Sequence, residues 1–103
     1  MADLRLAVNG EYFDAMLSGE KTEEYRIYND YWRKRIFSSA WNRPRAFSRL
    51  IITRGYPKRG DKSRIIDVEY LGYEIKTITH PFFGADPVKV FAIKVDISTR
   101  INK

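Results

Sequence analysis

The chain has 103 residues, of which 44% are hydrophobic and 15% aromatic, and this composition indicates one folded domain and excludes a disordered chain. It has no cysteine and a single histidine, His80, which excludes a disulfide framework and a zinc site built from thiolates or imidazoles. No segment approaches the roughly 20 apolar residues that span a bilayer, and the N-terminus has no signal-peptide core. We therefore expect one cytoplasmic domain over residues 1–103, with no cofactor, no metal ion and no membrane partner.

The formal net charge of +6 is unevenly distributed along the chain. Residues 1–32 carry three Lys or Arg against seven Asp or Glu, whereas residues 33–64 carry eleven against one, and the remainder is balanced. A basic block of this kind is typical of a surface that binds a polyanion such as nucleic acid. The alternative is a basic surface that only keeps the protein in solution.

The first third of the chain predicts a strand, a helix and a second strand. Apolar residues alternate over residues 3–8, which is the pattern of a strand with one buried face. Asn9 can cap a helix over residues 10–18, and Gly19 can end it. Residues 21–28 favour β-structure but carry polar side chains on both faces, so packing alone does not explain them.

The rest of the chain predicts mainly strands. A short helical segment is expected between residues 29 and 39. Further strands are expected over residues 47–53, 63–78 and 91–97, with Gly72 as a bulge within the second. Five strands and one or two short helices give an α+β fold, in which we expect the sheet to close or partly close into a small barrel, because closure removes exposed edges.

The segment after Gly19 brings together residues that suit a ligand pocket. Glu24 and Arg26 lie two apart on one face of the strand, and Thr22 is on the same face. Arginine donates to phosphate or a base edge, while glutamate accepts from an exocyclic amine or polarises water. Lys21 can place its ammonium near a phosphate, or act as a base if burial lowers its pKa. An exposed strand with an ordinary ion pair is the alternative.

Residues 9–26 form this helix-to-strand unit, and it resembles the Gly-x-Lys-x-x-Glu-x-Arg signature of ASCH domains, which are named for homology to a transcription coactivator and are related to PUA RNA-binding domains. The signature matches at Gly19, Lys21, Glu24 and Arg26. The resemblance extends to the order of strands over most of the chain. It implies a PUA-like β-barrel of about five strands, a cleft beside the signature, and RNA or a nucleotide as the ligand.

One ASCH subgroup is similar in length to this chain and hydrolyses N4-acetylcytidine, using a lysine and a threonine in this segment with a glutamate elsewhere. Lys21 matches that lysine, but Glu24 stands where the threonine would be, so we do not carry this amidohydrolase activity over. Nothing in the sequence indicates that Thr22 replaces it. Other ASCH proteins are ribonucleases, in which Lys, Tyr or Glu could transfer protons at the 2′-hydroxyl and phosphate.

Several residues outside the signature are secondary candidates. Arg54 ends a buried strand, where it would either reach phosphate at the pocket rim or remain a solvated loop charge. Tyr28, Trp32 and Trp41 could stack on a base, although aromatic residues more often belong to the core, and Trp41 is the better placed of the two tryptophans. His80 precedes a proline and has no recognisable partner, so we expect it to be structural or exposed.

Three functions are compatible with these patterns. The first is binding of RNA or a nucleotide, with contacts from Gly19, Lys21, Thr22, Glu24, Arg26, Tyr28, Trp41 and Arg54. The second is hydrolysis of nucleosides or RNA, with Lys21 as the base and Glu24 as an acid, a base or a water-orienting group. The third is a small regulatory protein whose basic face binds an acidic protein.

Overall fold

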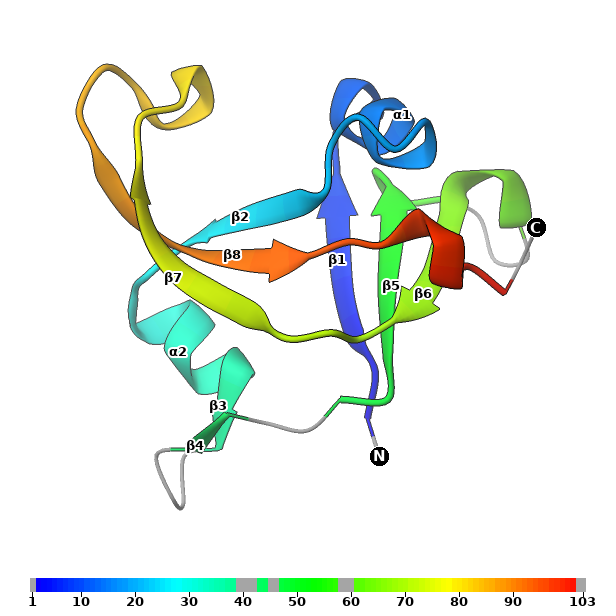
Figure 1. Ribbon diagram of the computed structural model, residues 1–103, viewed down its shortest axis with the longest axis horizontal. Helices are drawn as coiled ribbons and strands as arrows, with labels where there is room; N and C mark the ends of the chain where they lie inside the picture. Colours follow the sequence, from blue (N-terminus) through cyan, green and yellow to red (C-terminus); the bar gives the residue numbers. More distant parts are fainter. Residues whose placement is uncertain (1, 39–42, 45–46, 58–60, 102–103) are drawn as a thin grey trace.

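A computed structural model describes residues 2–38, 43–44, 47–57 and 61–101 of the chain (Figure 1). These residues form an α+β fold of two helices and two three-stranded sheets. The elements in chain order are β1 (Leu4–Val8), α1 (Gly10–Leu17), β2 (Glu23–Ile27), α2 (Asp30–Ile36), the short pair β3 (Phe37–Ser38) and β4 (Arg43–Pro44), β5 (Arg49–Arg54), β6 (Ile65–Glu69), β7 (Tyr73–Ile78) and β8 (Val88–Lys94). Single 3-10 turns lie at η1 (Lys62–Arg64), η2 (Pro81–Phe83) and η3 (Ile97–Thr99).

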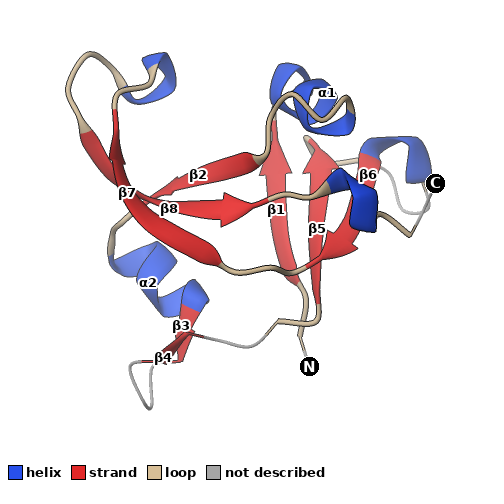
Figure 2. Cartoon of the chain, in the orientation of Figure 1, coloured by secondary structure: helices blue, strands red, loops and turns tan. Residues whose placement is uncertain are grey.

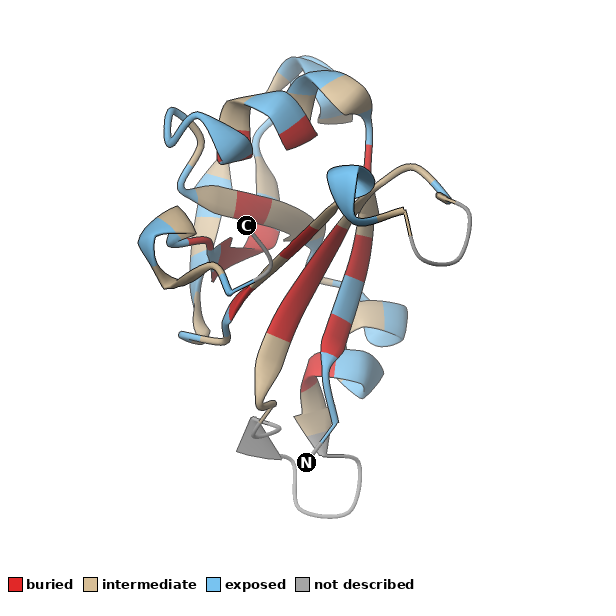
Figure 3. Cartoon of the chain, turned by 90° about the vertical axis from the view of Figure 1, so that its right-hand side faces the viewer, coloured by how far each residue is buried: buried red, intermediate tan, exposed pale blue. Residues whose placement is uncertain are grey.

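The two sheets enclose the core between them. The first has the order β1-β5-β6, in which β1 pairs with β5 in parallel, and the second is antiparallel with the order β2-β8-β7. The strands of one sheet run across those of the other (Figure 2), and buried residues occur on strands of both sheets (Figure 3). Alternate residues of β1, namely Leu4, Leu6 and Val8, point into this core, as the sequence pattern predicts.

An asparagine caps the start of each helix. Asn9 Oδ1 accepts a hydrogen bond from the Tyr12 backbone N–H at 2.9 Å, which confirms the cap expected for α1. Asn29 Oδ1 accepts from the Trp32 backbone N–H at 2.9 Å in the same way. Each cap satisfies a backbone donor that the first turn leaves unpaired, so it fixes where Tyr12 and Trp32 lie. No helix in the described part of the chain is long and apolar enough to cross a membrane.

The prediction of a single strand over residues 63–78 is wrong. β6 and β7 are separate strands that belong to different sheets. Gly72 lies between them with a φ of +86°, a conformation that glycine adopts without the strain that a Cβ brings. Gly72 therefore lies in the crossing from the first sheet to the second, where its carbonyl accepts from the Lys94 N–H at 3.0 Å, and it is not a bulge within one strand.

Two further expectations change in the structure. The last strand spans Val88–Lys94 and not residues 91–97, because the chain turns into η3 at Ile97. The strand pairings between described residues join no strand of one sheet to a strand of the other. The closed barrel is therefore not confirmed, and the edges of β1 and β2 remain open.

We expect Gly72→Ala to lower the free energy of unfolding by roughly 1–2 kcal/mol, the cost of a left-handed backbone for a residue with a Cβ. A Cβ at Gly72 would meet no atom within 4 Å, so this cost is conformational and not steric. Gly72→Asn should cost less, because asparagine tolerates positive φ better. Urea unfolding measures both variants, and a Gly72→Ala protein as stable as the wild type would contradict the prediction.

Candidate functional site

A cleft lies where the open edges of β1 and β2 approach each other, and we call it the seam cleft. Its volume is about 220 Å³. It is lined by β1, α1, the segment around β2, α2 and the η2 loop, through Ala7, Val8, Asn9, Tyr12, Lys21, Glu24, Tyr25, Arg26, Ile27, Trp32, His80, Phe82 and Phe83. Segments about 60 residues apart along the chain therefore meet here.

A buried ion pair forms one wall of the seam cleft. The side chain of Glu24 is 7% exposed, and Arg26 Nη2 donates to its Oε2 at 2.8 Å. The Tyr25 backbone N–H donates to Glu24 Oε1 at 3.0 Å. A carboxylate is tolerated inside a protein when it is paired and hydrogen-bonded in this manner. Since a carboxylate offers about four acceptor positions, Glu24 keeps capacity to accept from a ligand.

Arg26 also joins the two sheets. The same Nη2 atom donates to the Ala7 carbonyl of β1 at 2.8 Å. Its guanidinium carbon lies 5.0 Å from the centre of the Trp32 ring on α2, within the range of a cation–π contact. One side chain from β2 thus contacts β1 and α2, and it sets the distance between the walls of the cleft.

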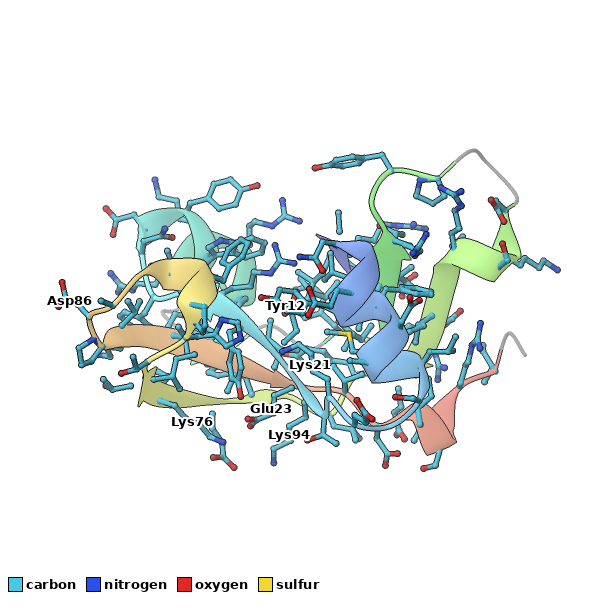
Figure 4. The ribbon with its side chains drawn as sticks, turned by 90° about the horizontal axis from the view of Figure 1, so that it is seen from above. Tyr12, Lys21, Glu23, Lys76, Asp86 and Lys94 are labelled. Atoms are coloured by element: carbon cyan, nitrogen blue, oxygen red, sulfur yellow. The ribbon has the colours of Figure 1, made fainter. Side chains whose placement is uncertain are left out.

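The ammonium of Lys21 rests on aromatic rings. Its Nζ lies 4.5 Å from the centre of the Tyr25 ring and 5.2 Å from that of Tyr12, and Figure 4 shows Lys21 beside Tyr12. None of the ion pairs between described residues includes Lys21. Burial lowers the pKa of Lys21, and the charges of Glu24 and Glu23 partly offset this. Lys21 is therefore a half-buried cation that can pair with an anionic ligand.

Glu23 holds Tyr25 in place beside Lys21. The Tyr25 hydroxyl donates to Glu23 Oε1 at 3.0 Å, and Lys76 Nζ of β7 donates to Oε2 at 2.7 Å. The hydrogen bond from Lys76 lowers the pKa of Glu23 and raises that of Lys76. Figure 4 shows Glu23 and Lys76 toward the β7 side of β2. Glu23 is thus engaged by Lys76 and Tyr25, not by Lys21.

His80 and the η2 turn form the opposite wall. His80 Nδ1 accepts from the Phe82 backbone N–H at 3.1 Å and so caps η2, a structural role of the kind the sequence predicts. Its ring also lines the cleft, 5.8 Å from the centre of the Tyr12 ring in an edge-to-face arrangement. The centre of the Phe82 ring lies 6.2 Å from that of the Tyr12 ring, and Phe82 is 68% exposed, so it presents apolar surface at the cleft.

The structure brings together the three charged residues of the signature. Lys21, Glu24 and Arg26 all line the seam cleft, a convergence that the sequence left open. Trp32 lines it as well. Trp41, which we preferred as the stacking tryptophan, lies outside the described residues.

Three other candidates do not line the seam cleft. Gly19 ends α1 with a φ of +87° and is exposed, and Thr22 is exposed at the start of β2. The Tyr28 ring packs on buried Phe91 with 4.9 Å between ring centres, and Lys89 covers it. Tyr28 therefore belongs with the core, which is the common role of an aromatic residue.

Arg54 packs α1 against the end of β5. Its Nη2 lies 3.6 Å from Asp14 Oδ2, and its guanidinium occupies the space above Gly10, where an added Cβ would come within 2.5 Å of Nη2. Arg54 does not line the seam cleft. A side chain at Gly10 would have to displace this guanidinium, which is the flexible end of Arg54.

The aromatic lining is the part of the site that sequence reasoning missed. Tyr12 fits an apolar helix face, and Tyr25 falls on the strand face opposite Glu24, so neither pattern indicates a ligand wall. Phe82 lies more than fifty residues from the signature and carries no local signal at all. Within the described ranges, no group of three or more His, Asp or Glu side chains is placed to hold a metal ion.

Comparisons with known proteins identify no relative. No protein-family model matches the chain, and no significant match was found among curated proteins or solved structures. The resemblance to ASCH domains therefore rests on the sequence patterns described above, and what it implies for function is treated as a proposal.

We expect Lys21 to lose its proton at a lower pH than Lys76, because burial lowers the pKa of Lys21 and the Glu23 hydrogen bond raises that of Lys76. The Cε resonances of ¹³C-labelled protein, followed by NMR from pH 8 upward, measure both pKa values. Glu24→Gln should lower the pKa of Lys21 further, since the Glu24 charge raises it. Titration of Lys21 at or above the pH of Lys76 would contradict this assignment.

We expect Arg26→Ala to lower the free energy of unfolding by roughly 3 kcal/mol, because it leaves the Glu24 carboxylate buried without its cation. Adding Glu24→Gln should recover part of this loss, since a neutral amide is cheaper to bury. Arg64→Ala serves as a control, because it breaks an exposed ion pair with Asp61 and should change stability by no more than about 0.5 kcal/mol. Urea unfolding compares the three, and an Arg26→Ala cost as small as that of Arg64→Ala would refute a structural role for the pair.

Proposed function

We propose that this chain is an ASCH-type domain of the PUA-like class that binds RNA or a nucleotide in the seam cleft. In this proposal the strands form a barrel that is left open between β1 and β2. One observation carries it: a cleft with aromatic walls contains Lys21 without a carboxylate partner among the described residues, beside the Glu24–Arg26 pair.

The chemistry of the cleft fits the parts of a nucleotide. The Lys21 ammonium can pair with a phosphate, and the charge-assisted hydrogen bond is strengthened by partial burial. The rings of Tyr12 and Trp32 offer faces or edges to a base. Glu24, which is fixed by Arg26 and the Tyr25 N–H, can accept from an exocyclic amine of the base.

We expect Lys21→Ala to weaken the binding of nucleoside 5′-monophosphates by about tenfold or more, the loss of one charge-assisted hydrogen bond. Lys94→Ala removes an exposed lysine that does not line the cleft and should leave affinity unchanged. Calorimetry with the four common monophosphates measures the affinities, and NMR shift mapping locates the site. Binding that is equal in the two variants, or that maps away from β2, would refute the proposal.

Hydrolysis is a second candidate, and the environment of Lys21 favours it. A lowered pKa increases the fraction of neutral amine, which can take a proton from a water attacking an acyl carbon, or from the 2′-hydroxyl of RNA. The negative charge of Glu24 would stabilise the Lys21 ammonium that this proton transfer forms. The absence of the subgroup's threonine argues against acyl transfer to the protein, so water would attack directly.

Lys21→Arg separates the two functions, because arginine keeps the positive charge but does not deprotonate. If the protein only binds, Lys21→Arg should retain most of the nucleotide affinity. If it is a hydrolase, product from acylated cytidines or single-stranded RNA should appear with the wild type and vanish with Lys21→Arg. No turnover of any substrate in this panel by the wild type would refute the hydrolase candidate.

A further inference from the structure

A second depression borders the seam cleft, and we call it the arginine groove. It has a volume of about 610 Å³ and shares Ala7, Arg26 and Trp32 with the seam cleft. It extends from α2 across the outer face of the β1-β5-β6 sheet to the residues that follow β5. A ligand that occupies the seam cleft can therefore continue into it past Arg26 and Trp32.

The floor of the arginine groove is a row of three side chains on the outer face of the β1-β5-β6 sheet. Alternate residues of β1 turn away from the core, and Ala7 is among them. The strand register places Ala7 beside Thr53 and Thr53 beside Ile65, so these three residues cross the sheet in one line. Ala7 and Thr53 are small, so the surface over β1 and β5 is open at this row, and Ile65 adds apolar surface at the β6 end.

The sides of the groove carry three arginines and exposed aromatic rings. Arg5, Arg26 and Arg35 line it, and its described lining contains no Asp or Glu. Tyr56 is 95% exposed and Tyr31 60% exposed, so neither ring contributes much to the core. A concave, positively charged surface with exposed tyrosines is suited to a ligand that has both negative charges and planar apolar parts.

Two of the three arginines are held in place by aromatic rings. Arg35 lies 5.5 Å from the centre of the Tyr31 ring and 5.3 Å from that of Trp32. Arg26 lies 5.0 Å from the Trp32 ring, so two guanidinium groups pack on the same indole. These contacts hold the donors in place before a ligand arrives, which reduces the entropy lost on binding.

We infer that the arginine groove binds single-stranded nucleic acid, taking the nucleotides adjacent to one held in the seam cleft. The inference rests on the proposed function, because it places one nucleotide in that cleft. Arg5 and Arg35 would pair with phosphates, and Tyr56 would stack on an unpaired base. A duplex hides the faces of its bases and so could not use the tyrosines, and an acidic peptide offers charge without bases.

The test compares the full-length protein with its Arg5→Gln/Arg35→Gln variant, using fluorescently labelled hexauridylate and hexathymidylate. The variant should bind hexamers at least about tenfold more weakly and bind uridine monophosphate as the wild type does. The slope of log affinity against log salt should fall by about 1.4, which is about 0.7 for each of two phosphates released from contact. Lys89→Gln/Lys94→Gln removes two exposed lysines of β8 that line neither depression, and it should behave as the wild type.

Tyr56→Ala tests stacking separately from charge. It should weaken hexamer binding about fivefold or more, as the loss of one stacked base predicts, while Tyr56→Phe should not. Because Tyr56 is almost fully exposed, the substitution leaves the fold intact. Stronger binding of hexauridylate than of hexathymidylate would indicate RNA, and equal binding would indicate that the groove accepts either.

Two results would overturn the inference. In the first, Arg5→Gln/Arg35→Gln binds hexamers as tightly as the lysine control does. In the second, polyglutamate binds as tightly as the hexamers and Tyr56→Ala has no effect, which would make this an acidic-protein surface. The proposed function fails in a different manner: if Lys21→Ala leaves monophosphate binding unchanged but hexamers still require Arg5 and Arg35, the groove stands and the seam cleft does not.

Discussion

Arg26 joins β1 to β2, and the shape of the site depends on this contact. The Val8 carbonyl accepts from the Gly55 N–H on the β5 side, so the Ala7 carbonyl before it points away from β5, toward the open edge. Arg26 Nη2 satisfies that carbonyl and neutralises Glu24 at the same time. Because a side chain spans the edges here and a backbone ladder does not, the strands stay farther apart than the roughly 4.8 Å of paired strands. The seam cleft occupies the resulting gap.

Among the described residues, the ion pairs around β2 engage both of its glutamates and do not include Lys21. Glu24 is bound by Arg26, and Glu23 is bound by Lys76 and by the Tyr25 hydroxyl. Lys21 is left on the rings of Tyr12 and Tyr25, where burial lowers its pKa. Glu24 and Glu23 are close enough to raise this pKa, but no ion pair between described residues includes Lys21, and a phosphate would supply that direct partner. Cations also pack on an aromatic ring at the border of the arginine groove, where Arg26 and Arg35 both contact Trp32. Both depressions therefore combine positive charge with aromatic rings.

Local signals predicted much of the fold, and they failed where distant contacts decide. Asparagine caps and the alternation of β1 depend on neighbouring residues only, so α1 and β1 were found with nearly correct bounds. A glycine at position 72 is compatible with a bulge inside one strand and with a crossing between two sheets. Only the pairing of β6 with β5 and of β7 with β8 distinguishes the two. Arg54 could not be placed from its strand position, because its partner Asp14 belongs to a helix forty residues earlier.

The sequence by itself determined that this is a small α+β domain with a concentrated basic block. It also determined that Glu24 and Arg26 share one face of a strand, because side chains two apart along an extended chain point to the same side. Whether Lys21 joins them in one cleft was left open. Only the tertiary structure decided what surrounds them. Tyr12, Trp32 and His80 reach the cleft from two helices and a distant turn, and no periodicity records that approach. The tertiary structure also decided that Arg26 connects the two sheets, because the Ala7 carbonyl at the open edge of β1 needs a hydrogen-bond donor.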